Sequence, residues 1–509
     1  MKALFVNPHK LIPSGFSLTL KASPPLGLAY IAGAVEQQGF DVRVFDCIAE
    51  SPDNYFAFED STDVSVQGIA FSDMFNKLDA HYDLIGVTVM FSNNWLVNRQ
   101  LINLLKENYP KAVIVAGGEH ISALPEYFLK DCPGLDMIVM GEGEETIAEV
   151  ATLLKMGQSY THVIGTACKL RSPEKNEIVL SGKRTRIREV DDIAPPAWHL
   201  FPLDKYFEND ISYGISYGNS LPIFATRGCP YECTFCSSPQ MWGTKYTMRS
   251  IENVMTEVKH LYNTYAVTNF DFYDLTAIVN KRWILDFCEA IKREGLKITW
   301  QIPAGTRSEA ITYEVAAALK ESGCKNITYA PESGSPDMLK AIKKKVVLPR
   351  MLNSIDQSHK AGLNIKLNIM MGYPDEKATD ILKTIWFLAK ASYYGATDAC
   401  PSIFNPYPGS MLFTELVERK EVTVSDEYFR SIVFSESLHH FNNYNRNNSK
   451  SMMLLLLFLS YLVFYVTNYL FRPVRAFRLF VNLATQKYET RGEYMLGEIL
   501  KRRKAIKST

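Results

Sequence analysis

Three cysteines lie close together in the stretch RGCPYECTFC, residues 227–236. Cys229, Cys233 and Cys236 follow one another at spacings of four and three positions. A structural zinc site closes with four protein ligands, and a disulfide needs a pair. Iron–sulfur clusters are held by thiolates, and a cubane with three protein thiolates keeps one iron free for an outside ligand. The motif therefore predicts a [4Fe–4S] cluster with one open position, with zinc as the alternative.

The remaining composition indicates an intracellular protein. The other six of the nine cysteines are scattered singly, mostly within apolar runs, which is typical of a reducing cytosol and not of a disulfide framework. The formal net charge of zero gives no basic surface for nucleic acid. The opening MKALFVNP reads as a strand that ends at Asn7-Pro8, not as a signal peptide. We expect a cytoplasmic chain with no nucleic-acid partner.

Strands and helices alternate in the first 190 residues. Short apolar runs predict strands, and helical spacing between most of them predicts a doubly wound, Rossmann-like parallel sheet covered on both faces; the runs are 2–8, 42–46, 84–90, 112–118 and 137–143. Ligands of such sheets bind beyond the carboxyl ends of the strands. The alternative is that the glycines there only make tight turns. The candidate binding residues at these ends are Pro25, Leu26, Gly27, Ser92, Asn93, Gly117, Gly118, His120, Gly141, Glu142 and Gly143.

A linker is predicted at 191–220, where Pro195-Pro196 blocks regular structure and Trp198 and Phe201 are anchors. The alternation then restarts. Six strand–helix units are too few for an eight-fold barrel but fit an open partial (β/α)6 barrel, with the cysteine loop directly after its first strand. The predicted strands are 221–227, 269–274, 297–303, 325–330, 365–371 and 398–404.

The cysteine spacing resembles that of the radical S-adenosylmethionine (SAM) superfamily, as do the stretches FYDLT, APESGS and NIMMGYPDE at later strands. The resemblance implies that Cys229, Cys233 and Cys236 ligate the cluster, and that the free iron chelates the methionine part of SAM. It further implies a SAM site. Its members would be Phe235 and the Gly372-Tyr373 pair near the adenine, Arg307 facing the carboxylate, and Glu332 at the ribose or amine. Pro331 departs from the usual isoleucine before that glutamate.

The first domain, with PPLGLAYIAGAVEQQG, GGEHIS and GEGEE, resembles the cobalamin-binding members of this superfamily. Many cobalamin proteins supply a cobalt ligand from a D-x-H-x-x-G loop. Here the corresponding loop is NPHKLIP, with His9 but neither that Asp nor that Gly. We therefore expect no histidine on the cobalt, His9 as an ordinary loop residue, and His120 near the nucleotide tail.

The resemblance implies an enzyme that cleaves SAM and activates a C–H bond, most often for C-methylation of an apolar or natural-product-like substrate. One alternative is an anaerobic oxidative cyclase of the tetrapyrrole type, without methyl transfer. An alternative of another class is a non-catalytic cobalamin or cluster sensor. The expected partners are a small, lipophilic substrate and an electron donor such as flavodoxin or ferredoxin.

The predicted division is a cobalamin-binding domain at 1–190, the linker 191–220, a radical SAM barrel at 221–420 and a helical region at 421–509. Within the last region, residues 452–471 are uncharged and long enough to span a bilayer. The basic residues that follow would then be exported against the positive-inside rule. Three interpretations stay open: a helix at a membrane surface or near a lipophilic substrate, a core helix, and a true span.

Overall fold

The computed structural model describes residues 1–14, 22–59, 61–171, 176–434 and 441–508, and the chain divides into two compact units. Unit 1 consists of Met1–Asn209, Thr234–Lys245 and Pro406–His440. Unit 2 consists of Asp210–Cys233, Tyr246–Asn405 and Phe441–Thr509. Each unit is described by itself.

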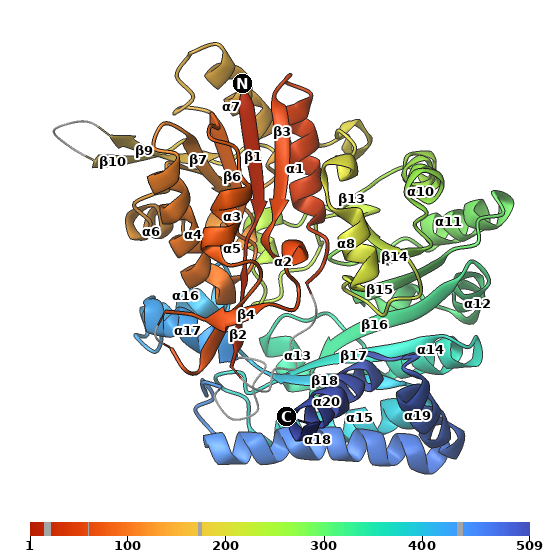
Figure 1. Cartoon of the computed structure of the whole chain (residues 1–509). Coiled ribbons are helices and arrows are strands. Elements are labelled where there is room, and N and C mark those ends of the chain that lie inside the picture. Colours follow the sequence, from red (N-terminus) through yellow and green to blue (C-terminus); the bar gives the residue numbers. More distant parts are fainter. Residues whose placement is uncertain (15–21, 60, 172–175, 435–440, 509) are drawn as a thin grey trace. The chain divides into compact units, whose positions relative to one another are not determined.

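Unit 1 is built on a seven-stranded sheet in the order β10-β9-β8-β7-β6-β1-β3 (Figure 1). Five neighbouring strands are parallel, namely β3, β1, β6, β7 and β8. Strands β9 and β10 extend the sheet at one edge in antiparallel pairing. The strands are β1 (Lys2–Asn7), β3 (Asp41–Asp46), β6 (Leu84–Thr88), β7 (Val113–Gly117), β8 (Met137–Val139), β9 (Thr166–Arg171) and β10 (Asn176–Leu180).

Strand order reverses between β1 and β6, because the chain moves from β1 outward to β3 and then returns to β6. Right-handed crossovers in opposite directions place their helices on opposite faces of the sheet. The helices are α1 (Leu26–Glu36), α2 (Cys47–Glu50), α3 (Phe71–Lys77), α4 (Trp95–Asn108), α5 (Glu119–Ala123), α6 (Pro125–Asp131) and α7 (Glu144–Lys155). The predicted doubly wound domain is confirmed, with its switch point at the carboxyl ends of β1 and β6.

Several elements of unit 1 were not predicted. A small antiparallel sheet joins β2 (Lys10–Pro13), β5 (Val64–Gln67) and β4 (Tyr55–Ala57). The linker forms the short helix α8 (Leu203–Glu208), and later segments add α9 (Ser238–Trp242), α16 (Met411–Glu418) and α17 (Asp426–Val433). Trp198 is buried, and Pro195 crosses α1 so closely that a Cβ on Gly33 would lie 2.7 Å from its carbonyl oxygen. The linker is therefore packed against α1.

Unit 2 is an open barrel of six parallel strands in sequential order, as predicted. Runs of buried β-branched and aromatic residues make these strands, since both of their faces are covered. They are β11 (Ser220–Ile223), β14 (Asn269–Phe272), β15 (Thr299–Thr306), β16 (Cys324–Glu332), β17 (Asn364–Met371) and β18 (Asp398–Ile403); a two-stranded ribbon of β12 (Thr226–Arg227) and β13 (Thr247–Met248) brackets the cysteine loop.

The helices of unit 2 follow the strands and continue into the C-terminal region. They are α10 (Ile251–Tyr265), α11 (Lys281–Arg293), α12 (Tyr313–Glu321), α13 (Pro336–Ala341), α14 (Leu348–Lys360), α15 (Ala378–Tyr394), α18 (Lys450–Phe471), α19 (Pro473–Thr485) and α20 (Arg491–Ser508). The apolar helix α18 packs on α15 and on the last strand β18. It takes the place of the helix that completes the sixth strand–helix unit.

Candidate active site

The carboxyl ends of β6, β7 and β8 lie at one edge of the unit 1 sheet, because these strands are parallel and in register. Ser92 and Asn93 begin a short 3-10 turn after β6, Gly117 ends β7, and Gly141–Gly143 follow β8. Pro25–Gly27 open α1, the helix between β1 and β3. The structure thus brings the predicted cobalamin-binding residues to the edge where the strand order switches.

Glycines at this edge leave room for a ligand. A Cβ on Gly27 or Gly141 would meet no atom within 4 Å, and Gly141 has a φ of +76° that side chains disfavour. Gly118 is different, because its φ is +127° and a Cβ there would lie 2.7 Å from the Val89 carbonyl oxygen. The open space beside Gly27 and Gly141 fits the close approach of a bulky group such as cobalamin to the backbone.

His120 is buried at 3% exposure among Trp95, Phe128 and Phe429. Its Nδ1 lies 2.8 Å from the Ser92 hydroxyl, and burial lowers its pKa to about 3, so the ring is neutral. His9 lies in the loop between β1 and β2, as predicted, but it is buried, and its Nε2 lies 2.6 Å from the Ile69 carbonyl oxygen. Both imidazoles are therefore held by contacts within unit 1.

Glu142 lines a small hollow of about 70 Å³ within unit 1. Its carboxylate accepts a hydrogen bond of 2.8 Å from the Ile187 N–H and lies 3.5 Å from the Arg186 guanidinium. Glu119, on the other side of the hollow, accepts a hydrogen bond from Ser237, and burial raises its pKa. The contacts of Glu142 join the loop after β8 to the segment after β10.

In unit 2 the predicted SAM residue Glu332 ends β16 and is buried. Its φ of +66° is uncommon for a residue other than glycine, and a register shift between Tyr329 and Glu332 accompanies it. Lys344 lies 3.0 Å from this carboxylate, and its own side chain is 14% exposed. Burial works against the Lys344 ammonium, yet the charges of Glu332 and Cys233 hold its pKa above the ordinary value. The pair places a cation close to Cys233.

Arg307 follows β15 and is oriented by three contacts. Its guanidinium lies 4.0 Å above the ring of Tyr231, a residue of the cysteine loop, and it donates to the Lys345 carbonyl oxygen and to Glu309. The aromatic face favours the cation. Arg307 therefore lies in the same part of unit 2 as Cys233 and Glu332. This is the arrangement expected if the three residues belong to one site.

The Gly372-Tyr373 pair follows β17 in a turn closed by Glu376. Glu376 Oε2 accepts hydrogen bonds from the N–H of Gly372 at 2.6 Å and of Tyr373 at 3.3 Å. Tyr373 is fully buried and packs on Phe404 with ring centroids 5.3 Å apart. Burial, with the charges of Glu332, Glu376 and Cys233, raises the pKa of Tyr373.

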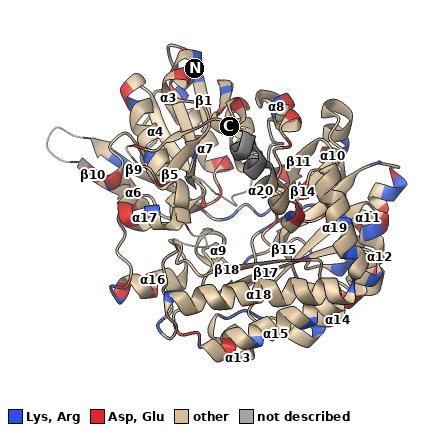
Figure 2. Cartoon of the chain, turned by 60° about the horizontal axis from the view of Figure 1, so that its bottom comes forward, with Lys and Arg blue, Asp and Glu red and all other residues tan. Residues whose placement is uncertain are grey.

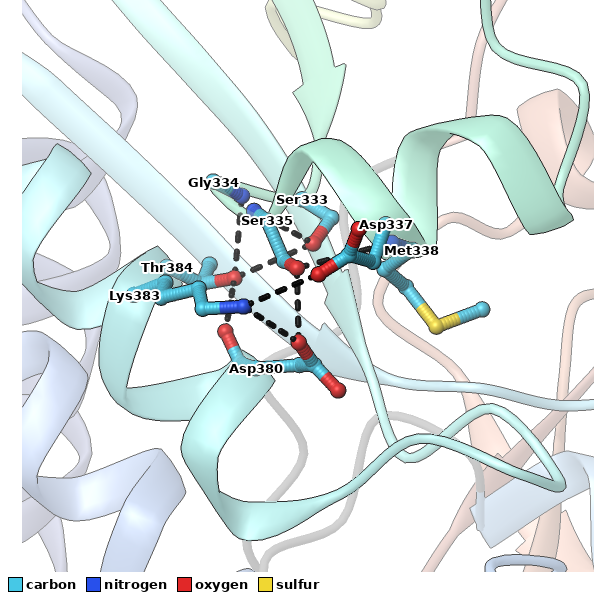
Figure 3. Close-up of polar contacts among 8 residues, drawn as sticks. All are labelled: Ser333, Gly334, Ser335, Asp337, Met338, Asp380, Lys383 and Thr384. Carbon is cyan, nitrogen blue, oxygen red and sulfur yellow. Dashed lines mark hydrogen bonds and ion pairs between the residues drawn. The ribbon is translucent and has the colours of Figure 1, made fainter.

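The turn after Glu332 is fixed by hydroxyl groups (Figure 3). Thr384 Oγ1 on α15 accepts a hydrogen bond of 2.9 Å from the Gly334 N–H and lies 3.1 Å from the Ser333 hydroxyl. Ser335 caps α13 and donates to Asp380 at 2.7 Å, and Lys383 lies 3.1 Å from the same carboxylate. These contacts attach the ESGS turn to α15 and so hold Glu332 in its unusual conformation.

Two parts of this site were missed from the sequence. Lys344 lies in the run KAIKKK, which reads as a solvated charged surface, and only its position in the fold shows that it turns inward. Asn445 donates to the carbonyl oxygens of Tyr373 at 2.6 Å and of Glu376 at 2.8 Å. The cluster of asparagines before the apolar helix was the sequence feature that could have indicated these hydrogen bonds.

The cysteine loop offers thiols without competing bonds between them. No disulfide joins Cys229, Cys233 and Cys236 in the described part of the chain; Cys233 is buried and the other two are half-buried. Burial raises the pKa of Cys233, and the nearby charges of Lys344 and Arg307 oppose that rise. Among the described residues no three His, Cys, Asp or Glu side chains are already gathered as a metal site. The donor set of three thiols with cations nearby fits a [4Fe–4S] cluster with one open iron.

Comparison with known proteins identifies two domains in the chain. The B12 binding domain matches residues 21–151, and the Radical SAM superfamily matches residues 223–388. An uncharacterized methyltransferase of Pyrococcus horikoshii, PH0819, is 31% identical over 394 residues, which cover 77% of this chain and 78% of that protein. The chain belongs to the radical SAM superfamily, in the group that joins a B12-binding domain to the radical SAM domain.

Other relatives share both domains but differ in reaction. Cytidylyl-2-hydroxyethylphosphonate methyltransferase of Streptomyces wedmorensis is 28% identical, covering 84% of each protein. Anaerobic magnesium-protoporphyrin IX monomethyl ester cyclase of Cereibacter sphaeroides is 24% identical, covering 84% of this chain and 66% of the cyclase. The solved structure of the radical SAM methyltransferase TsrM of Kitasatospora setae, with cobalamin and a [4Fe–4S] cluster bound, has the same fold; the TM-score is 0.63 at 17% identity, over 82% of this chain and 75% of that one. The protein is a radical SAM enzyme, and its cofactors are cobalamin, a [4Fe–4S] cluster and SAM, as predicted.

Proposed function

We propose that this enzyme is a cobalamin-dependent methyltransferase that methylates a carbon atom of an apolar or natural-product-like small molecule. The observation that carries the proposal is the pairing of a B12-binding and a radical SAM domain in a chain 31% identical to a protein named as a methyltransferase. A cobalamin-bound methyl group is a ready donor to an activated substrate carbon, and the cofactors supply this chemistry when they are bound.

We assign the following roles to the chain. Cys229, Cys233 and Cys236 hold the cluster. Phe235, Arg307, Glu332, Gly372 and Tyr373 bind SAM, and the residues at the sheet edge of unit 1 bind cobalamin; these are Pro25–Gly27, Ser92, Asn93, Gly117, Gly118, His120 and Gly141–Gly143. Arg307, oriented by Tyr231, suits a carboxylate, since guanidinium groups recognise carboxylates in a fixed geometry. Glu332, held by Lys344, suits an amine or a hydroxyl group. We keep 1–190, 191–220, 221–420 and 421–509 as the functional division.

The second candidate is an anaerobic oxidative cyclase, and the similarity to the C. sphaeroides cyclase favours it. The product mixture separates the candidates. Reconstituted protein would be incubated without oxygen with SAM, methylcobalamin, a reductant and lipid or tetrapyrrole extracts, and analysed by mass spectrometry. A methyltransferase should give 5′-deoxyadenosine, S-adenosylhomocysteine and a product heavier by one methyl group. Formation of 5′-deoxyadenosine without S-adenosylhomocysteine would indicate cyclisation, and cofactor binding without either product would indicate a sensor.

The chemistry also suggests partners and location. A small-molecule substrate follows from the enzyme family. We propose a flavodoxin or ferredoxin as the electron donor, no nucleic acid, and a cytoplasmic location, because the cluster and the scattered free thiols need a reducing compartment. We also propose that the protein makes a peripheral contact with the inner face of the membrane.

A further inference from the structure

Helix α18 presents a continuous apolar stripe to solvent. Leu455, Phe458, Leu462, Val466 and Leu470 recur at intervals of three and four residues, and each side chain is at least 44% exposed, up to 71% for Leu470. Residues at this spacing lie on one face of a helix. A face of this kind with several neighbouring large apolar groups is uncommon on the surface of a soluble protein and marks a contact surface.

The opposite face of α18 is attached to the barrel by polar bonds. Tyr461 donates to the Pro401 carbonyl oxygen at 2.9 Å, Asn468 to that of Ala396 at 2.7 Å, and Tyr465 to Asp398 at 2.7 Å. A helix that crossed a bilayer would have to break these bonds and carry its buried polar groups into hydrocarbon, which is costly. Although α18 is long and apolar enough to span, its fold position makes it a barrel helix with one free face.

The apolar stripe continues onto the neighbouring helices. Phe471, at the end of α18, meets Tyr393 of α15 edge to face with ring centroids 4.9 Å apart. After Pro473, α19 exposes Val474, Phe477 and Phe480, the two aromatic residues at 69% and 70%. We call the exposed apolar side chains of α18 and α19 the docking face.

The segment that carries the docking face has only positive charges, although Glu489 and Glu493 just after it lie close to Arg475. Residues 450–488 contain no Asp or Glu, and their basic residues are Lys450, Arg472, Arg475, Arg478 and Lys487. Lys450, at the first position of α18, is its only charged residue, and Figure 2 shows no charge along the rest of the helix. Arg472 donates to the backbone carbonyl oxygens of Ser392 and Tyr393, and Arg478 and Lys487 are exposed.

A second basic feature lies beside α15. An open groove of about 770 Å³ is lined by α13, α14 and α15, and none of its lining residues is acidic. Lys340, Lys345 and Lys390 line it, and Lys390 also lies 5.3 Å from the centre of the Trp386 ring, which is 63% exposed. Lys383 at the same groove is paired with Asp337 and Asp380. Of these lysines, Lys390 lies on α15, the helix on which α18 packs, whereas Lys340 lies on α13 and Lys345 precedes α14.

We propose that the docking face binds a bilayer surface that contains anionic lipids, with α18 and α19 lying in the plane of the membrane. The apolar side chains enter the boundary between head groups and acyl chains, and the basic residues meet lipid phosphates. This places the enzyme where lipophilic molecules are concentrated. The proposal concerns binding alone and stands whether or not the methyl-transfer chemistry is correct.

The test is co-sedimentation of the full-length, cofactor-loaded protein with two kinds of vesicle, pure phosphatidylcholine and phosphatidylcholine mixed with phosphatidylglycerol. We expect binding to the mixed vesicles, release by high salt, and extraction by carbonate. Phe477→Glu with Phe480→Glu should reduce binding at least tenfold, since both rings are exposed and their loss leaves the core unchanged. Arg478→Gln with Lys487→Gln should weaken binding by about fivefold for each charge removed. Matched controls are Tyr313→Glu, an exposed aromatic residue on α12, and the pair Lys281→Gln and Lys292→Gln on α11, and these should bind as the wild type does.

Three results would overturn the proposal. Equal binding to both vesicle types would remove the role of the basic residues, and resistance to carbonate would mean a spanning helix. Absence of vesicle binding, together with a dimer in sedimentation velocity that Phe477→Glu dissociates, would assign the face to a second copy of the chain. Cluster and cobalamin spectra of each variant show whether the fold is retained, and they do not depend on methyl transfer.

Discussion

At the scale of single residues, Cys233 combines burial with a nearby pair of cations. The thiolate that ligates iron must be formed in a site where burial disfavours it, and Lys344 and Arg307 offset that cost. The three cysteines are the only protein ligands that we assign to the cluster, so the loss of any one of them leaves too few.

We predict that Cys233→Ala loses nearly all cluster iron. Anaerobically reconstituted wild type should hold about four irons per chain, measured by iron and sulfide analysis. Cys400→Ala, a half-buried cysteine of β18 far from the loop in sequence, is the matched control and should keep full iron. Full iron in the Cys233 variant would contradict the cluster assignment.

The carboxyl group of Glu376 reports on the turn that carries Gly372 and Tyr373. Burial raises its pKa from 4.5 to about 7. The hydrogen bonds that it accepts from two backbone N–H groups act in the opposite direction and offset only part of this rise. The folded state therefore binds more protons than the unfolded state between pH 4.5 and 7. The stabilisation present below pH 4.5 is lost as the pH rises through 7.

We expect Glu376→Gln to remove this dependence. Between pH 6 and pH 8 the wild type should lose about 1 kcal/mol of unfolding free energy relative to the variant, from linkage between the two pKa values. Denaturant unfolding of both proteins at the two pH values measures the difference. Parallel pH profiles would mean that the carboxyl group is ionised in the fold throughout this range.

At the scale of elements, hydrogen bonds join the ESGS turn to α15, and the two together hold Glu332. The N–H of Gly334 is buried and is accepted by the hydroxyl oxygen of Thr384, which comes from a helix fifty residues later in the chain. Because Glu332 precedes this turn with a φ of +66°, the hydrogen bond also holds a strained residue of the proposed SAM site.

Thr384→Val keeps the shape of the side chain and removes the acceptor. We predict a loss of about 1–3 kcal/mol in unfolding free energy, the usual cost of a buried donor left unsatisfied, and a weaker affinity for SAM. Equilibrium denaturation and SAM binding by calorimetry measure the two effects. Thr379→Val, at an exposed position of the same helix, should change neither. A stable variant with unchanged SAM affinity would show that the turn does not need this contact.

At the scale of the whole molecule, both units present their ligand-binding residues at the carboxyl ends of parallel strands. His9 and His120 are 1% and 3% exposed, so both rings are closed off from a ligand at the sheet edge of unit 1, although Nδ1 of His9 and Nε2 of His120 have no hydrogen-bond partner in the structure. His9 is bound to the Ile69 carbonyl oxygen, and His120 lies in an aromatic core with Nδ1 at the Ser92 hydroxyl.

We therefore predict that cobalamin binds to the full-length protein without a histidine on the cobalt. Paramagnetic resonance of the Co(II) form should lack nitrogen hyperfine splitting from a protein imidazole. Protein labelled with ¹⁵N-histidine is the control, because a coordinated imidazole would change its splitting pattern on labelling. Such a change would refute the prediction and would require His9 or His120 to become accessible from its buried position.

The sequence by itself determined the order and type of the main elements. All six barrel strands and the five parallel strands of unit 1 were predicted, because buried parallel strands are short, continuous apolar runs between helical stretches, a pattern that is local in sequence. The cysteine loop was also predicted, since a ligand set within eight residues needs no knowledge of the rest of the chain. The edge strands β9 and β10 and the small sheet around β5 were missed, because short, half-exposed strands have weak patterns.

Only the tertiary structure decided which residues support the site and what the apolar helix does. Lys344 faces Glu332 and Asn445 binds the turn of Tyr373 because strands and helices distant in sequence meet there, and composition gives no sign of such pairings. The twenty uncharged residues 452–471 were compatible with a core helix, a surface helix and a span, and only the basic residues after them argued against the span. In the fold, one face of α18 packs on the barrel, because its polar side chains bond to β18 and to the loop before it. The other face of α18 is exposed. Hydropathy averages over both faces, whereas packing acts on each face separately.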